Sequence, residues 1–538
     1  MSDNRKELET VLWAGADVLR SKMDANEYKN YLLSFIFYKY LSDSFLVKVY
    51  DLLEDCIPDS MEQAQSAYEE AYQSEEAADL LADLKDTFRY IIQPELTFTA
   101  LAQRANRKDD DKIRKPFSRE DLKKAFNDIE NSDPIFAHMF DDVDLYSTRL
   151  GVNDTRQSAT VAELVKVIDQ ADLLHAEGDV LGNAYEYLIG QFASETGKKA
   201  GEFYTPSGPA EIVTRIAIDG QEDKRGLLVY DPCMGSASML LDTRKFSKHP
   251  KYVRYFGQEL MLSTYNLAKM NMFLHGIAPE NQRLHNGDTL DADWPTTEET
   301  EFDSVVMNPP YSAKWSAVKG FLSDERFSDY GVLAPKSKAD YAFLLHGFYH
   351  LKPTGTMAII LPHGVLFRGA AEGTIRQKLL EDGSIYAVIG LPGNMFYNTS
   401  IPTCIVVLKK HRPGRDVLFV DASRLFEKKK TQNVMSPAHI DRVMELYKNR
   451  QDVEKEAHLA TFAEIKENGF NLNIPRYVDT FEEEEAVDLA EVNAELKAVD
   501  AEIAETRDAV ASMLGQLRSE DETLMAAIQD FMRIMEEL

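Results

Sequence analysis

Between about Ala162 and Pro475, short apolar or β-branched runs alternate with stretches of helical pattern. Six of these runs are strand candidates: Gly226–Tyr230, Val253–Phe256, Ser304–Met307, Thr356–Leu361, Ile385–Leu391 and Cys404–Leu408. Each is bounded by turn residues or followed by helix-like sequence, which predicts a parallel sheet covered by helices on both faces. Open sheets of this kind bind ligands at the carboxyl ends of their strands, so the chemically active residues should follow strands.

Helical sequence precedes and follows this segment. Residues 1–160 show few strand signals, and Tyr28–Val47 is apolar almost all round, as in a helix buried inside a bundle. The sequence therefore predicts a helical N-terminal domain over 1–160, an α/β domain over 161–475 and a helical tail over 476–538.

The tail carries a heptad pattern after an acidic run, Glu482–Glu485. Its repeating positions, three and four residues apart, are Leu489, Val492, Leu496, Val499, Ile503, Thr506, Val510, Met513 and Leu517. A helix with one apolar seam needs a partner, which is either a second helix of the same chain, roughly Leu524–Leu538, or another subunit.

Composition bounds the location and the partners. The formal net charge is −30, so the surface as a whole should repel DNA unless a local basic face or a basic subunit brings it in. The three cysteines, Cys56, Cys233 and Cys404, lie far apart, which fits neither a disulfide framework nor a zinc site and favours a reducing cytoplasm. The polar N-terminus and the lack of long apolar runs predict neither secretion nor a membrane span.

The most specific motif is Asn308-Pro309-Pro310-Tyr311, directly after the strand candidate Ser304–Met307. Asn308 offers a side-chain carbonyl, and Pro309 offers a backbone carbonyl on a rigid segment. Two such acceptors can hold the hydrogens of an amino group while its nitrogen stays nucleophilic. Tyr311 offers a flat face for a base taken out of a double helix. The motif therefore indicates chemistry on a planar amine.

Three further loops follow strands and suit an adenosine-bearing ligand. In Val229–Leu240 (VYDPCMGSASML), Asp231 closes a strand, and small residues let backbone amides approach a ligand. Glu259, in YFGQEL, ends the next strand, where an acid can accept from ribose hydroxyls. Asp288, in HNGDT, can accept from an adenine amino group. Upstream, Gly201–Pro206 (GEFYTP) precedes a helix and could cover the other end of the ligand, or it is an N-capping turn.

The order of these motifs resembles the adenine-N6 DNA methyltransferases. More narrowly, the chain resembles the modification subunit of type I restriction-modification systems, and the resemblance spans nearly the whole chain. The narrower match rests on five segments: Ala25–Asp43, Asp179–Ala193 (DVLGNAYEYLIGQFA), Gly355–Gly369 (GTMAIILPHGVLFRG), Leu391–Thr403 (LPGNMFYNTSIPT) and Asn471–Val478. It implies a Rossmann-like S-adenosylmethionine-dependent methyltransferase sheet with helices on both faces, between an all-α N-terminal domain and a helical, coiled-coil tail.

The resemblance also implies roles for individual residues. The target adenine is expected at Asn308, Pro309, Pro310 and Tyr311. The cofactor, S-adenosyl-L-methionine, is expected at Glu202, Phe203, Tyr204, Thr205, Pro206, Asp231, Met234, Gly235, Ser236, Glu259 and Asp288. One departure is that Ala237 and Ser238 follow Ser236 where the broader class often has two glycines, so a backbone amide there approaches the cofactor less closely. Phe396 is either a second stacking face or a core residue.

The expected reaction is in-line attack of the adenine amino nitrogen on the sulfonium methyl, with the protein acting by positioning and electrostatics. Alternative substrates for this motif are adenine in RNA and a glutamine side chain, and a vestigial core in an assembly protein is a further alternative. His346 and His350 have the spacing of metal ligands, but no third ligand is evident, and no metal is expected. Lys428–Lys430 is a short basic run that either contacts phosphate or forms a solvated turn, and the pattern favours the turn.

The resemblance implies partners as well. Between the Asn-Pro-Pro-Tyr motif and the C-terminus no long basic insert is evident that could read DNA in its grooves. DNA is therefore expected to bind through a complex with a specificity subunit, a second copy of the modification subunit and a restriction subunit.

Overall fold

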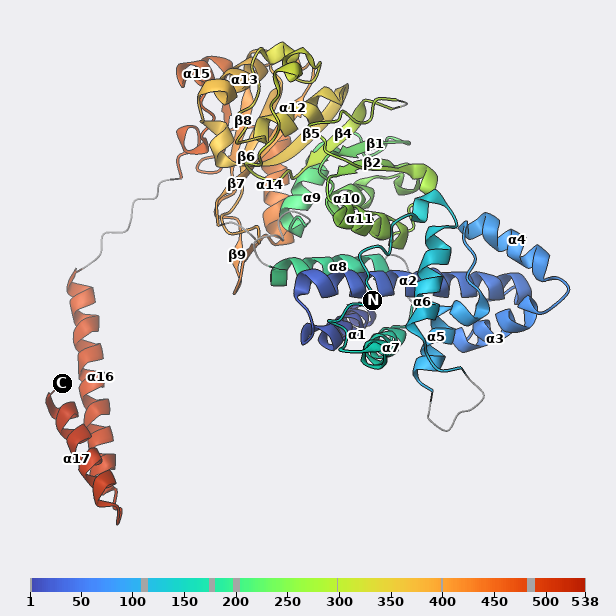
Figure 1. The fold of residues 1–538 in the computed structure, drawn as a ribbon. Coiled ribbons are helices and arrows are strands. Elements are labelled where there is room, and N and C mark those ends of the chain that lie inside the picture. The colour runs from blue at the N-terminus through green and yellow to red at the C-terminus, as the bar shows by residue number, and fades with distance from the viewer. Residues whose placement is uncertain are drawn as a thin grey trace. The chain divides into compact units, whose positions relative to one another are not determined.

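The computed structural model describes residues 2–107, 115–173, 180–196, 204–297, 299–397, 400–480 and 489–537. The chain forms two compact units, Met1–Thr480 and Phe481–Leu538. The first unit contains a helical front and a sheet covered by helices, and the second contains two helices (Figure 1). The boundaries proposed from sequence at residues 160 and 475 stay a prediction.

The helical front packs around one long central helix, α2 (Ala25–Glu54). Its other helices are α1 (Ser2–Arg20), α3 (Met61–Tyr72), α4 (Ala77–Phe88), α5 (Phe98–Ala105), α6 (Arg119–Glu130), α7 (Asp154–Asp169) and α8 (Val180–Thr196). The neighbouring helices cover α2 on several sides, because its own side chains Phe35, Phe37 and Phe45 are all fully buried. The prediction of a buried helix over Tyr28–Val47 is therefore confirmed.

One sheet of nine strands has the order β11-β8-β6-β7-β5-β4-β1-β2-β3. Its strands are β1 (Leu228–Asp231), β2 (Arg254–Glu259), β3 (Gln282–Asn286), β4 (Phe302–Met307), β5 (Leu351–Pro362), β6 (Ile385–Gly390), β7 (Thr403–Lys409), β8 (Val417–Asp421) and β11 (Ala457–Ala460). A separate hairpin pairs β9 (Glu427–Lys428) with β10 (Asn433–Val434).

The sheet is mixed, which corrects the expectation of a parallel sheet. β7 runs antiparallel to β5 and β6, and β11 runs antiparallel to β8, while the other pairs are parallel. The described part of the connection 391–402 contains no helix, so the chain returns directly beside β6 in the opposite direction. All six strand candidates overlap observed strands. The overlooked strands of this sheet are β3 (QRLHN) and β11 (AHLA), which lie at its edges and have little apolar sequence, and β8 (VLFVD), which is apolar and internal.

Helices cover both faces of the sheet, as expected. The helices α9 (Ser207–Ala217), α10 (Ser238–Phe246), α11 (Leu262–Leu274) and α14 (Pro437–Asn449) pack on one face. The helices α12 (Asp340–Tyr349) and α13 (Ala370–Glu381) pack on the other, with α15 (Phe462–Glu467) beside them. Successive residues of β4 contact opposite faces of the sheet: Val306 belongs to the core of the first face, and Val305 and Met307 belong to the core of the second.

Helix α11 joins the helical front to the sheet. Its side chains Leu267 and Met270 belong to the core of the front, whereas Ala268 and Met272 pack with the sheet. Two carbonyls of the front accept hydrogen bonds from α11, one of them from Lys269 Nζ to Ala137 at 2.9 Å. The two parts therefore share one helix.

The second unit is a pair of helices, α16 (Leu489–Gln516) and α17 (Glu522–Glu537). They contact each other where Gly515 on α16 approaches Met532 on α17. The apolar seam of α16 nevertheless stays largely exposed; for example, Leu496 and Ile503 are each 59% exposed. Helix α17, one of the two partners predicted for this seam, therefore contacts α16 but leaves most of the seam exposed. Among the described residues, no helix is long and apolar enough to cross a membrane.

Candidate active site

The carboxyl ends of β1, β2, β3 and β4 meet at a cavity of about 250 Å³. Its lining residues are Pro232, Cys233, Glu259, Leu260, Met261, Asp288, Thr289, Asn308, Pro310 and Phe343. Parallel neighbouring strands bring residues that are far apart in sequence to one sheet edge. The structure thus brings Glu259, Asp288, Asn308 and Pro310 together, as the sequence predicts.

Asp231 lies at the end of β1 and is fully buried. Its Oδ1 accepts a hydrogen bond from the Cys233 amide at 2.9 Å, and its Oδ2 has no hydrogen-bond partner among the described residues. Burial raises the pKa of Asp231 to about 8, and the nearby Glu259 carboxyl adds to the rise. A buried carboxyl with one unpaired oxygen suits a cationic or hydrogen-donating ligand.

The loop after Asp231 is supported from behind by two other elements. The Gly235 amide donates to Glu259 Oε2 at 3.2 Å, and Gly235 has a φ of +54°, which favours glycine. The Ser236 carbonyl accepts from Asn271 Nδ2 on α11 at 2.9 Å. Met234 is buried and packs against Gly257 of β2, where a Cβ would collide with the Met234 sulfur. These contacts determine how close the loop amides come to the cavity.

The two acids after β2 and β3 are held by backbone amides. Glu259 Oε1 accepts from the Met261 amide at 2.9 Å, while its Oε2 accepts from Gly235. Asp288 Oδ1 accepts from the Leu290 amide at 2.9 Å. A carboxylate oxygen has more than one acceptor site, so both groups keep capacity for ligand hydroxyl or amino hydrogens.

Asn308 is clamped on both sides of its amide. Its Nδ2 donates to Thr205 Oγ1 at 2.9 Å, and its Oδ1 accepts from the Tyr311 hydroxyl at 2.8 Å. Burial raises the pKa of Tyr311, so this hydroxyl stays a donor. The Tyr311 ring meets the Phe396 ring edge to face, with centroids 6.0 Å apart. Pro309 is buried and Pro310 is exposed at the cavity.

The segment before α9 connects to this clamp through Thr205. Tyr204 packs near Tyr397, with ring centroids 6.1 Å apart, and Pro206 is the N-cap residue of α9. The other two predicted cofactor residues of this segment, Glu202 and Phe203, lie outside the described residues.

A network that the sequence analysis overlooked holds the turn after Tyr311. Ser312 has a φ of +52°, and its amide donates to Asp340 Oδ1 at 2.7 Å. The fully buried Asp340 also pairs with Arg368, which in turn pairs with Glu372. Phe343, which lines the cavity, comes from the same helix as Asp340. Neither residue lies in a recognisable motif, although Arg368 lies within the segment Gly355–Gly369 that carried the resemblance.

Comparison with known proteins identifies the family. A family model described as "N-6 DNA Methylase" matches residues 176–486, and one described as "HsdM N-terminal domain" matches residues 8–168. The chain belongs to the N-6 DNA methylase family. Within it, the chain is similar to the type I restriction enzyme MpnII methylase subunit of Mycoplasma pneumoniae, with 35% identity over 91% of this chain and 93% of that protein.

Two further relatives agree. The MjaVIII methylase subunit of Methanocaldococcus jannaschii is 30% identical over 94% of this chain and 84% of that protein. The crystal structure of a type I restriction-modification methyltransferase subunit from Streptococcus thermophilus is 57% identical and has a TM-score of 0.86, covering 89% of this chain and all of that one. The methylase is thus an adenine-N6 DNA methyltransferase subunit of a type I restriction-modification system, from an S-adenosylmethionine-dependent family. The resemblance inferred from sequence is confirmed.

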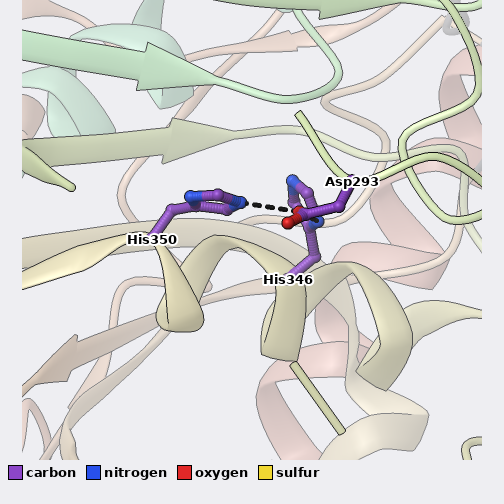
Figure 2. Close-up of side chains that lie close together, drawn as sticks. All are labelled: Asp293, His346 and His350. Carbon is purple, nitrogen blue, oxygen red and sulfur yellow. Dashed lines mark hydrogen bonds and ion pairs between the residues drawn. The ribbon is translucent and has the colours of Figure 1, made fainter. Parts of the chain in front are cut away.

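The two histidines of the methylase with metal-ligand spacing have a neighbour that the sequence analysis did not find. Asp293 Oδ1 lies 2.9 Å from His350 Nε2 and 3.8 Å from His346 Nδ1 (Figure 2). However, Arg326 donates to His346 Nδ1 at 3.1 Å, and the Tyr230 hydroxyl lies 2.8 Å from His346 Nε2. Because a guanidinium already occupies the side of His346 that faces Asp293, the cluster is a buried hydrogen-bond network that ties α12 to β1.

Proposed function

We propose that Asn308, Pro309 and Tyr311 hold a flipped-out adenine at the mouth of the cavity, with Pro310 shaping the opening. The observation that carries the proposal is the clamped Asn308 amide. Thr205 and Tyr311 fix its orientation, and Oδ1 keeps a second acceptor position for an amino hydrogen. The Pro309 carbonyl would accept the other amino hydrogen, and the Tyr311 ring would stack on the base, with Phe396 behind it.

The proposed cofactor site is the cavity itself. S-adenosylmethionine, when bound, supplies a methyl group activated by its positive sulfur. Glu259 would accept from the ribose hydroxyls and Asp288 from the adenine amino group, with Leu260, Met261 and Phe343 as apolar walls. The unpaired Oδ2 of Asp231 fits a cationic donor, which favours this group at the end of β1. Gly235 and Ser236 would offer the backbone, Met234 would support the loop, and Glu202–Pro206 would cover the methionine end.

The protein's own contribution to the reaction is positioning. Accepting both amino hydrogens would keep the nitrogen lone pair directed at the methyl group and would stabilise the charge that develops on the nitrogen during transfer. The proton that the methylated nitrogen then loses would pass to a nearby acceptor or to water, so no separate base is needed. Burial raises the pKa of Cys233, which keeps that thiol protonated and disfavours covalent catalysis.

The proposed site is tested by Asn308→Ala in the assembled complex. Methylation of duplex DNA should be lost while the complex still forms and still binds S-adenosylmethionine. Asn281→Ala, at a half-buried turn before β3 that is remote from the cavity lining, is the matched control and should methylate like the wild type. Methylation retained in Asn308→Ala would refute the site.

The methylase belongs to a type I complex, and we propose that its direct partners are a specificity subunit, a second methylase subunit and a restriction subunit, together in the cytoplasm. Two observations support partners: the net charge of −30, which disfavours DNA binding by the chain alone, and the exposed seam of α16. Co-purification with candidate neighbours, followed by mapping of methylated adenines, tests this. Leu496→Asp combined with Ile503→Asp should release whichever of these subunits binds the seam of α16. Glu502→Asp, which keeps the charge on the same helix, is the control.

A further inference from the structure

Three consecutive lysines lie at the end of a small hairpin beside the site. The strands β9 and β10 pair through two residue pairs, and the Lys429 amide donates to the Gln432 carbonyl at 3.1 Å. Lys428, Lys429 and Lys430 are all exposed, and among the described residues none of the three forms an ion pair. In a chain with a net charge of −30, these three lysines form a local positive cluster, with one exposed acid, Glu427, directly before them.

Hydrogen bonds attach the hairpin to the loop that carries Phe396. The Asn433 amide donates to the Asn394 carbonyl at 3.0 Å, and Asn433 Nδ2 donates to the Gly393 carbonyl at 2.7 Å. Gln432 Nε2 donates to the Met395 carbonyl at 3.0 Å. Met395 directly precedes Phe396, whose ring contacts Tyr311. The lysines are therefore connected to one wall of the proposed adenine site.

The base of the hairpin contacts the other side of the site. Met435, directly after β10, is buried, and its Cβ lies 3.1 Å from where a Cβ on Gly208 would be. Gly208 is in the first turn of α9, three residues after Thr205, which holds Asn308. The hairpin thus bridges the segment before α9 and the Phe396 loop, and its position relative to Asn308 is fixed from two directions.

A second lysine group follows Tyr311. Lys314, Lys319 and Lys336 are exposed and Lys338 is half-buried, and none of the four forms an ion pair within the described ranges. The Trp315 amide donates to the Lys336 carbonyl at 3.1 Å, so the two segments lie side by side. Lysines that form no ion pair with the described residues therefore occur both on the segment after Tyr311 and on the hairpin attached to Phe396.

We propose that Lys428, Lys429 and Lys430 bind backbone phosphates of the DNA strand that carries the flipped adenine. A base held at Tyr311 keeps its own sugar and phosphates at the mouth of the site. Cations on a rigid hairpin tied to that site would neutralise these phosphates and release their counterions, whatever the base sequence. This contact would compensate locally for the negative charge of the rest of the chain. The inference rests on the proposed function and assigns it a DNA contact surface.

The test replaces the three lysines together, K428Q/K429Q/K430Q, in the assembled complex. The KM for a duplex substrate should rise by roughly tenfold or more, and the slope of log Kd against log salt should fall by about 2 to 3, at about 0.9 per lost phosphate contact. The kcat at saturating DNA and the Kd for S-adenosylmethionine should stay unchanged. K428R/K429R/K430R, which keeps the charge, should retain the wild-type slope.

The matched control is K85Q/K251Q/K466Q, which removes the same charge from three exposed lysines elsewhere. A hairpin variant with the same KM and salt slope as this control would overturn the inference while leaving the proposed function intact. Loss of a partner subunit from the hairpin variant would also overturn it, because the lysines would then bind protein. A wild-type complex that fails to methylate DNA would instead refute the proposed function.

Discussion

Asp340→Ala should slow methyl transfer although Asp340 contacts no ligand in the proposed site. Its carboxylate accepts from the Ser312 amide at 2.7 Å and from Arg368 at 2.5 Å, and it is fully buried. Ser312 directly follows Tyr311 and has a φ of +52°. The substitution therefore removes the bond that holds a left-handed residue next to the proposed base-stacking tyrosine.

The expected loss of rate depends on the conformational energy of the turn, on the lost ion pair and on the displacement of Tyr311. A serine in the left-handed region costs about 1–2 kcal/mol, so without the hydrogen bond to Asp340 the turn after Tyr311 should relax to a different geometry. Because Glu372 still pairs with Arg368, the lost ion pair should cost less than the about 3–5 kcal/mol of an isolated buried pair. A displacement of Tyr311 by about 1 Å would lower kcat on the order of 100-fold.

Single-turnover methylation by the assembled complex, together with calorimetric binding of S-adenosylmethionine, measures the two effects separately. We expect a lower methylation rate with an unchanged cofactor Kd. Adding Ser312→Gly to Asp340→Ala should recover part of the rate, because glycine adopts a positive φ without strain. A single variant that melts earlier but methylates at the wild-type rate would refute the reasoning, since Asp340 would then only stabilise the fold.

Four further outcomes are expected. Thr205→Val should lower kcat roughly tenfold, because the Asn308 amide loses the acceptor that orients it, whereas Thr205→Ser keeps the hydroxyl and should be near wild type. Equal kcat values for the two variants would contradict a role of this hydrogen bond in orienting Asn308. Burial raises the pKa of Asp231 to about 8, so its carboxyl is protonated at pH 7, whereas a bound cation would favour the carboxylate. The affinity for S-adenosylmethionine should therefore rise with pH up to about 8, and it should not change with pH in Asp231→Asn. Calorimetry in two buffers should show that binding releases a proton. The free protein should lose the stability contributed by this group as pH rises from about 4 to 8, which thermal melts of the same pair would show. Chelation or added zinc should leave the melting temperature unchanged, because Arg326 already bonds His346; a zinc-dependent increase would show that the cluster binds metal.

The sequence predicted which candidate residues lie at the carboxyl ends of strands, while their roles stay a prediction. Asp231, Glu259 and Asn308 each end or follow an apolar run, and parallel neighbours must bring such positions together. Their local pattern therefore carried enough information to predict both the strand and the place of the side chain.

Residues that reach the site from elsewhere could not be predicted in the same way. Asp340 and Phe343 lie on a helix whose first turn contacts the loop after Tyr311 only through the tertiary fold, and a buried acid in a helix has no local signature. The antiparallel direction of β7 depends on the path of the connection 391–402, which apolar patterning does not encode. The β9–β10 hairpin contains too few apolar residues to give a strand signal.

Helix α11 has a consequence for engineering. One side of α11 packs against the helical front, and on the other side Asn271 donates a hydrogen bond to the Ser236 carbonyl. The helix also begins just after Glu259. Chimaeras that exchange the front between related methylases would therefore change the support of the loop after Asp231, which is the proposed cofactor loop, even when the junctions lie far from this loop in sequence. Grafts that retain the backbone around Ala137, which accepts from Lys269, should tolerate the exchange better than those cut through it.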